Sequence, residues 1–120
     1  MTSITRKLWG RSPDGTAIYK YTLRNSGGAS VTLCSIGAGI VSVNVPDKDG
    51  KLGDVALGYA KPESYFGDGP CMGKCPGRYA NRIENAVFNV GGKTYQLEAN
   101  SGANHLHGCF NRKLYRVKSF

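Results

Sequence analysis

The chain has 120 residues, which is enough for one domain and leaves little room for a second. Its hydrophobic fraction of 40% is typical of globular proteins, which excludes a wholly disordered chain and a membrane-embedded bundle. Sixteen Lys and Arg residues outnumber eight Asp and Glu residues, so the net charge of +8 raises nucleic acids and acidic surfaces as partners. The 17 glycines and five prolines predict many turns and few long helices.

Neither a membrane span nor a secretory signal is visible in the sequence. No segment approaches the roughly 18 consecutive apolar residues of a span, and the first ten residues contain no apolar run. The four cysteines, at positions 34, 71, 75 and 109, are too few for a disulfide-dense secreted scaffold. We therefore expect a cytoplasmic protein with no membrane partner, whose cysteines are thiols.

Strand-like runs separated by turns occupy the first half of the chain. Residues Ala17–Leu23 alternate, so Ala17, Tyr19, Tyr21 and Leu23 share one face of a predicted strand. Further strands are predicted at Ser30–Ile36, Ile40–Val45 and Asp54–Tyr59. Turns are predicted at Pro13–Gly15 and Pro46–Gly50, because proline presets its φ and glycine supplies a positive one.

The second half contains a long loop and a predicted hairpin. Residues Lys61–Gly77 are rich in Gly, Pro, Asp and aromatic residues, and long loops of this kind are often functional. The strands Ala86–Val90 and Thr94–Leu97 flank Gly91-Gly92, which is a hairpin signal. No helix of convincing length is predicted. The fold class is therefore all-β, with strands spaced as in a sandwich or barrel.

Cysteine and histidine residues raise a zinc site as one alternative. Cys71 and Cys75 lie four apart, and His105, His107 and Cys109 follow at intervals of two. These residue types are the usual zinc ligands. On a strand, however, the last three would face the same way and crowd one side of a tetrahedron. A zinc-stabilised basic nucleic-acid binder is therefore the less favoured alternative.

Asn81, Arg82 and His107 are the candidate site residues. A guanidinium, an amide and an imidazole are the groups that a site for polyhydroxylated substrates would use. An Asn-Arg pair beside a turn is equally compatible with backbone capping and a surface charge, and a lone histidine with a structural hydrogen bond. Residue chemistry by itself leaves both interpretations open.

Three segments around these residues resemble the aldose 1-epimerases, or galactose mutarotases. They are GRYANRI at 77–83, FNVGGKTYQL at 88–97 and NHLHG at 104–108, and the segments 39–50 and 54–59 fit the same family in the same order. The resemblance runs from about Thr16 to Gly108. It implies a large antiparallel β-supersandwich of the galactose mutarotase type, of which this chain would be the N-terminal part.

The resemblance also implies an activity. Members of the family interconvert the α and β anomers of free aldohexoses, such as galactose or glucose, by acid–base ring opening, without metal or organic cofactor. The counterparts of Asn81 and Arg82 hold sugar hydroxyls. The counterpart of His107 binds the substrate and assists near the reacting centre. With a sugar as partner, no nucleic-acid partner is expected for the basic charge.

Members of the family are much longer than this chain, and their general-base glutamate and general-acid histidine have no counterpart here. Glu84, Glu98 and His105 do not match those positions. We therefore expect residues 1–120 to be a single domain or the N-terminal segment of a larger sandwich domain. It would carry the substrate-binding half of the site, be inactive alone and, with open strand edges, dissolve poorly. A non-catalytic carbohydrate-binding module is the other alternative, and the preferred sugar and oligomeric state are left open.

Overall fold

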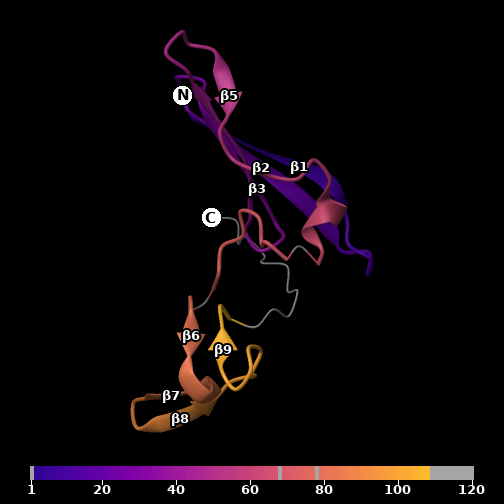
Figure 1. Ribbon diagram of the computed structural model, residues 1–120. Coiled ribbons are helices and arrows are strands. Elements are labelled where there is room, and N and C mark those ends of the chain that lie inside the picture. Colours follow the sequence, from indigo (N-terminus) through magenta and orange to yellow (C-terminus); the bar gives the residue numbers. More distant parts are fainter. Residues whose placement is uncertain (1, 68, 78, 109–120) are drawn as a thin grey trace. The chain divides into compact units, whose positions relative to one another are not determined.

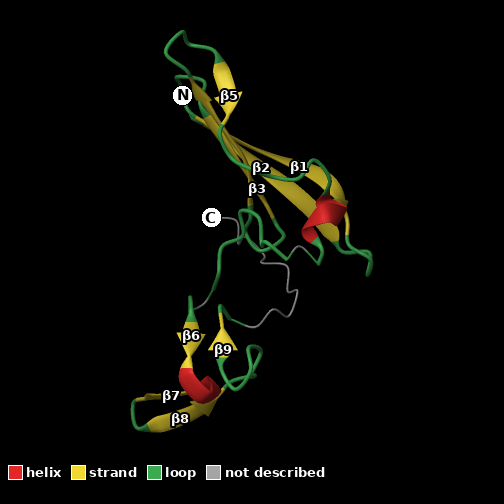
Figure 2. Cartoon of the chain, viewed as in Figure 1, coloured by secondary structure: helices red, strands yellow, loops and turns green. Residues whose placement is uncertain are grey.

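The computed structural model describes residues 2–67, 69–77 and 79–108, and these form two compact units. The sheet unit comprises the described residues up to Cys75, and the hairpin unit comprises those from Pro76 to Gly108. Every strand pair is antiparallel, and the only helices in the described part are single 3-10 turns (Figures 1 and 2). The predicted all-β class is therefore confirmed.

The sheet unit is a five-stranded meander in which each strand pairs with the next along the chain. Its strands are β1 (Ser3–Arg11), β2 (Ala17–Arg24), β3 (Ser30–Cys34), β4 (Ile40–Pro46) and β5 (Leu52–Asp54). The predicted strands at 17–23, 30–36 and 40–45 correspond to β2, β3 and β4 within two residues at each end. The turn between β4 and β5 also forms as expected, since Gly50 donates its N–H to the carbonyl of Asp47 at 3.0 Å.

Two features of this sheet differ from the prediction. The edge strand β1 was not predicted, because charged residues such as Arg6 and Lys7 interrupt its apolar pattern. The predicted strand Asp54–Tyr59 is wrong, because β5 ends at Asp54. The Asp54 carboxylate accepts the backbone N–H groups of Val43 at 2.9 Å and Ala56 at 3.1 Å. This local side-chain bonding turns the chain away from the ladder.

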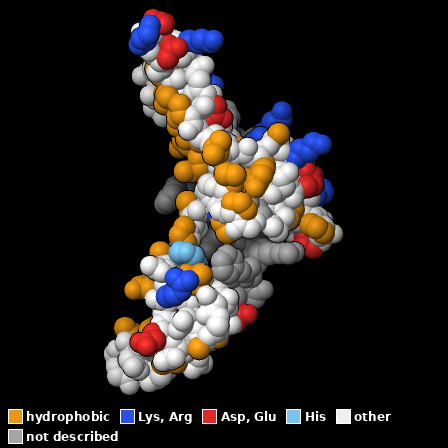
Figure 3. Space-filling model, viewed as in Figure 1, with side chains coloured by type: hydrophobic (Ala, Val, Ile, Leu, Met, Phe, Trp, Pro, Cys, Tyr) orange, Lys and Arg blue, Asp and Glu red, His pale blue; other side chains and the backbone are white. Residues whose placement is uncertain are grey.

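The two faces of the sheet differ in chemistry. The register places Ile4 opposite Leu23 and Leu23 opposite Val31, and the alternation assigns one apolar face to them. The apolar face comprises Ile4, Leu8, Tyr19, Tyr21, Leu23, Val31, Leu33 and Val43. Arg6 lies on the same face, with its guanidinium 4.5 Å above the centre of the Tyr19 ring. The opposite face carries Thr5, Lys7, Lys20, Thr22 and Thr32, together with the buried residues Ile18 and Cys34 at one end. Apolar side chains are visible at the surface of this unit in Figure 3, and Ile4 is 69% exposed.

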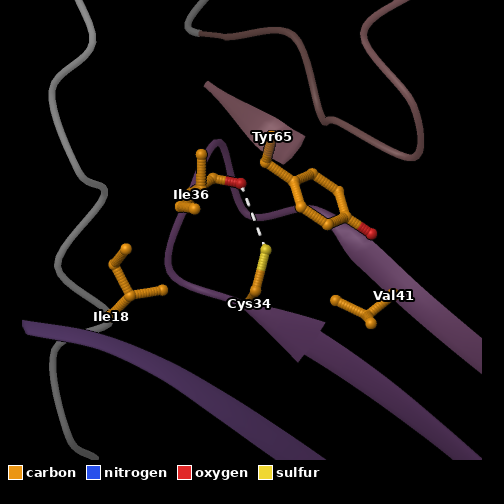
Figure 4. Close-up of a cluster of buried hydrophobic side chains, with 5 residues drawn as sticks. All are labelled: Ile18, Cys34, Ile36, Val41 and Tyr65. Atoms are coloured by element: carbon orange, nitrogen blue, oxygen red, sulfur yellow. Dashed lines mark hydrogen bonds between the residues drawn. The ribbon is translucent and has the colours of Figure 1, made fainter. Parts of the chain in front are cut away.

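The core of the sheet unit lies where the loop after β5 packs back on the strands. Its buried members are Ile18, Cys34, Ile36, Val41 and Tyr65 (Figure 4). Tyr65 belongs to the 3-10 turn η1 (Pro62–Tyr65), and its ring meets the rings of Trp9 and Tyr59 edge-on. Its hydroxyl accepts the Tyr59 N–H at 3.0 Å. The described part of the loop predicted at 61–77 thus anchors the sheet through an aromatic cluster.

The hairpin unit is built from four short strands and one 3-10 turn. They are β6 (Arg82–Ile83), η2 (Glu84–Ala86), β7 (Val87–Val90), β8 (Lys93–Gln96) and β9 (His105–Leu106). The predicted hairpin is confirmed, since β7 and β8 pair around Gly91 and Gly92, which both have positive φ. Phe88 stacks on Tyr95 across this hairpin with ring centroids 5.1 Å apart. β6 pairs with β9 in a separate ladder.

Among the described residues, none of the helical turns has the length or the apolar character needed to cross a bilayer.

Candidate functional site

The pairing of β6 with β9 brings the three predicted site residues together, although His107 lies 25 positions after Arg82 and 26 after Asn81 in the chain. In this ladder Arg82 lies opposite Leu106 and Ile83 lies opposite His105. One position beyond the ladder, His107 donates its backbone N–H to the carbonyl of Asn81 at 3.0 Å. Asn81, Arg82 and His107 therefore occupy one end of the ladder between β6 and β9. Figure 1 shows these two strands.

The imidazole of His107 forms the second hydrogen bond of the pair with Asn81, which the backbone carbonyl of His107 would form in a regular ladder. A hydrogen-bonded antiparallel pair exchanges two N–H to carbonyl bonds. Here the N–H of Asn81 donates to Nδ1 of His107 at 2.9 Å, in the place of the carbonyl of that residue. Because Nδ1 is an acceptor in this bond, a neutral His107 carries its proton on Nε2. His107 is exposed, so this N–H is available to a ligand.

The backbone at both partners is left-handed. Asn81 has a φ of 66° and His107 a φ of 58°. Asparagine and histidine both adopt this region several times more often than most non-glycine residues, although it is uncommon for either. Non-glycine residues of this kind cost of order 1–3 kcal/mol and cluster at ligand sites. With this positive φ, the carbonyl of His107 points away from Asn81, and the ring nitrogen accepts the Asn81 N–H in its place.

Arg82 lies on the exposed side of the same ladder. Its side chain is exposed, while its neighbour Ile83 is half-buried, as the alternation of a strand requires. Arg82 forms no ion pair with any described residue. An exposed guanidinium on a strand can bind an oxygen-rich ligand.

His105 has a different environment from His107, two residues away. It is buried, with 6% of its surface exposed, and its Nδ1 lies 2.7 Å from the carbonyl oxygen of Glu98. A carbonyl can only accept, so Nδ1 of His105 carries the proton. The two histidines therefore have opposite tautomers, and His105 has a structural role. Glu84 and Glu98 are exposed, as expected for surface residues.

Asn100 and Asn104 are two residues near the site whose roles the sequence did not reveal. The side chain of Asn100 bonds the backbone of Leu106 and Gly108, on either side of His107. The Oδ1 atom of Asn104 accepts the N–H of Asn85 at 3.0 Å. Two asparagines four positions apart, with Ser101 and Gly102 between them, are the signal that could have suggested such side-chain to backbone bonds.

The structure does not support a zinc site in the described part of the chain. No three Cys, His, Asp or Glu side chains come together there as a metal ion would require. Cys71 and Cys75 belong to the sheet unit, whereas His105 and His107 belong to the hairpin unit. The remaining predicted ligand, Cys109, lies outside the described residues.

A polar hollow of about 440 Å³ lies on the sheet unit, and none of the predicted site residues lines it. Its lining includes Lys20, Thr22, Thr32, Ser42 and Asp54. Desolvation lowers the pKa of the Lys20 ammonium, which lies 4.0 Å above the centre of the Trp9 ring. The two threonine hydroxyls bond each other at 3.0 Å, and the Asp54 carboxylate is engaged by backbone N–H groups. Thr22, Thr32, Lys20 and Asp54 therefore already have partners within the sheet unit.

Comparison with known proteins identifies similar sequences over most of the chain. The profile of the family described as aldose 1-epimerase matches residues 19–120. Galactose mutarotase from Mus musculus is 42% identical over 111 residues, which are 92% of this chain and 32% of that protein. Aldose 1-epimerase from Escherichia coli is 41% identical over 97 residues, 81% of this chain and 28% of that protein. The chain thus spans about a third of the length of the curated relatives that it matches.

Solved structures agree with these sequence matches. Galactose 1-epimerase from Lactobacillus acidophilus superposes with a TM-score of 0.67 and 27% identity, covering 89% of this chain and 30% of that one. An aldose epimerase homologue from C. elegans also gives a TM-score of 0.67, with 28% identity, and covers 100% of this chain and 33% of its own. The fold class predicted from the resemblance is confirmed by these neighbours.

Proposed function

Because the chain belongs to the aldose 1-epimerase family, we propose that it carries the sugar-binding half of a mutarotase site formed by Asn81, Arg82 and His107. The substrates are free aldohexoses such as galactose and glucose. The observation that carries this proposal is the ladder between β6 and β9, at whose end these three residues meet.

Each residue has a role that its chemistry supports. The exposed guanidinium of Arg82 and the amide of Asn81 bind sugar hydroxyls. His107 presents its Nε2–H, since Nδ1 accepts the backbone N–H of Asn81, and therefore donates to an oxygen of the sugar near the anomeric centre. The fixed tautomer makes His107 a donor toward the substrate while its ring is neutral.

The reaction is an acid–base ring opening. A base removes the proton of the anomeric hydroxyl while an acid protonates the ring oxygen, and the C1–O5 bond breaks to give the free aldehyde. Rotation about C1–C2 and reclosure on the other face of the carbonyl invert the anomeric centre. The residues of this chain hold the sugar during these steps. Glu84, Glu98 and His105 do not match the acid and base of the family. We therefore assign the two proton transfers to groups other than these three residues.

We therefore expect the 120-residue chain to bind galactose and not to accelerate its mutarotation. Polarimetry of α-D-galactose gives the rate, and calorimetric titration with D-galactose gives the affinity. Arg82→Ala removes charge-assisted hydrogen bonds worth about 1.5–3 kcal/mol, so the affinity should fall by roughly 10- to 100-fold. Lys93→Ala, which removes another exposed cation of the hairpin unit, is the matched control and should bind as the wild type does.

Three outcomes would contradict this proposal. A mutarotation rate well above that of buffer would overturn the inactivity of the chain. A folded chain that binds no galactose would overturn the binding half. Equal affinities for Arg82→Ala and Lys93→Ala would place the sugar elsewhere, as in a carbohydrate-binding module of a different kind.

We propose that the protein is cytoplasmic. Cys34 and Cys75 are free thiols, which is the usual state of cysteine in a reducing compartment.

A further inference from the structure

The side chain of Asn100 bonds the backbone on both sides of His107. Its Nδ2 donates to the carbonyl of Leu106 at 2.9 Å and to the carbonyl of Gly108 at 3.0 Å. Its Oδ1 accepts the N–H of Leu106 at 2.6 Å. Both donors and the acceptor of the amide are thus used, and all three bonds end on the two residues that flank His107 in the chain.

Asn100 acts here as a substitute for a neighbouring strand. Leu106 lies opposite Arg82 in the ladder, and its N–H and carbonyl both bond the Asn100 amide. An asparagine side chain has the donor and acceptor of a peptide group and can mimic it. β9 is therefore bonded on one edge by β6 and on the other edge by a single side chain.

The backbone of His107 requires such support. Its φ of 58° is costly for a histidine, and the following Gly108 has a φ of 79°. Two consecutive residues with positive φ make a sharp bend, and because His107 is exposed, its half of the bend relaxes unless the ends are held. Asn100 holds both ends, because the carbonyls before and after His107 share the same NH₂ group.

The bend in turn determines which nitrogen of His107 is protonated. Only with its carbonyl turned away can the ring accept the N–H of Asn81 at Nδ1. If the bend relaxed to an extended conformation, the carbonyl would take that N–H in the regular antiparallel pattern. Nδ1 would then lose its donor, and both neutral tautomers would be accessible.

From these contacts we propose that Asn100 is a positioning residue, which fixes His107 in the left-handed bend and thereby selects its Nε2–H tautomer. The effect on sugar binding rests on the proposed function, whereas the effect on the tautomer does not. Asn100 touches neither the ring of His107 nor the sugar in this proposal, and acts through the backbone alone.

The test compares two substitutions of asparagine by aspartate in the same loop. Asn100→Asp removes both donors and sets a carboxylate oxygen against the carbonyls of Leu106 and Gly108. Asn104→Asp makes the same change of charge but keeps the oxygen that accepts the Asn85 N–H, so it is the matched control. The readout is the tautomer of each histidine in the ¹⁵N-labelled full chain, from two-bond proton–nitrogen NMR correlations of the imidazole rings.

We expect a single Nε2–H tautomer for His107 in the wild type and in Asn104→Asp, and a mixture of tautomers in Asn100→Asp. The galactose affinity of Asn100→Asp should be about tenfold weaker, equivalent to one net hydrogen bond. His105 is an internal control, because its Nδ1–H tautomer persists wherever the hairpin unit is folded. A native His107 tautomer in folded Asn100→Asp would overturn the proposal.

A second variant covers the possibility that Asn100→Asp does not fold. Asn100→Ser removes the amide without adding charge, and mixed tautomers of His107 beside a native His105 signal would support the proposal. If both variants lost the His105 signal, Asn100 would be a general structural residue and the positioning role would be wrong. If the wild type bound no galactose, the proposed function would fail while the tautomers still decided the role of Asn100.

Discussion

At the scale of single residues, the Cys34 thiol links the stability of the sheet unit to pH. Burial raises its pKa above the ordinary value of 9.0, against the opposing effect of hydrogen bonds at Ile36 and Gly39 and of the nearby ammonium groups of Lys20 and Lys74. Between the unfolded and folded pKa values the folded chain binds more protons than the unfolded chain. The free energy of unfolding therefore falls as pH rises through this window, and is unaffected below it.

Cys34→Ala should remove this dependence. Urea unfolding at about pH 7 and about pH 10 should show a larger loss of stability in the wild type than in Cys34→Ala, whose cavity cost is the same at both pH values. Lys20, whose pKa is lowered by desolvation, changes stability in the opposite direction as pH rises. Because the Cys34 thiolate partly offsets that lowering, Cys34→Ala enlarges this opposite effect and so widens the difference between the two proteins. Cys75→Ala, at an exposed thiol, is the control and should follow the wild type. Parallel pH profiles for Cys34→Ala and the wild type would refute the linkage.

At the scale of elements, the loop after β5 packs so closely on β4 that only glycine fits at position 58. A Cβ on Gly58 would lie 2.2 Å from the carbonyl oxygen of Val41 and 3.1 Å from the hydroxyl of Tyr65. Gly58→Ala should therefore lower the free energy of unfolding by about 1–3 kcal/mol, measured by urea titration. Gly53→Ala in β5, where a Cβ meets nothing within 4 Å, should change it by less than about 0.5 kcal/mol. Equal stabilities for the two variants would show that the loop does not pack on β4.

The elements also show how far sequence patterns predict this fold. The alternation in β2 and the glycine pair between β7 and β8 are local signals, and both elements form as predicted. β1 lacks such a signal, because an edge strand does not need an apolar residue at every second position. β6 and β9 have two residues each and are defined only by each other, so no window of sequence could reveal them. The strand predicted at 54–59 failed because a single carboxylate, that of Asp54, redirects the backbone.

The candidate site also combines features that the sequence signals locally with features that depend on long-range pairing. Asn81, Arg82 and His107 were found through a resemblance between motifs, since their separate chemistry also fits structural roles. Their proximity depends on the pairing of β6 with β9, and the tautomer of His107 depends on one bond from Asn81. Asn100 was not found, because its role lies in bonds to backbone six and eight residues ahead. Such bonds require knowledge of the bend at His107.

At the scale of the whole molecule, charge and exposed apolar surface oppose each other. The net charge of +8 repels copies of the chain from one another, and salt screens this repulsion. The sheet edges are poor sites for pairing, because β1 carries Arg6, Lys7 and Arg11 and β5 has only three residues. The apolar face remains, with Ile4 69% and Leu8 50% exposed. We therefore expect copies to associate through this face rather than through the edges.

This expectation is tested by placing one lysine on either face of β1. Sedimentation velocity should show a monomer at roughly 20 mM salt and larger species at roughly 0.5 M, where the Debye length falls below about 5 Å. Ile4→Lys adds a charge to the apolar face and should keep the chain monomeric at high salt. Thr5→Lys adds the same charge to the opposite face of the same strand, so it should associate as the wild type does. Association of both variants to the same extent would exclude the apolar face as the contact, and a wild type that stays monomeric at high salt would show that the charge is not what holds copies apart.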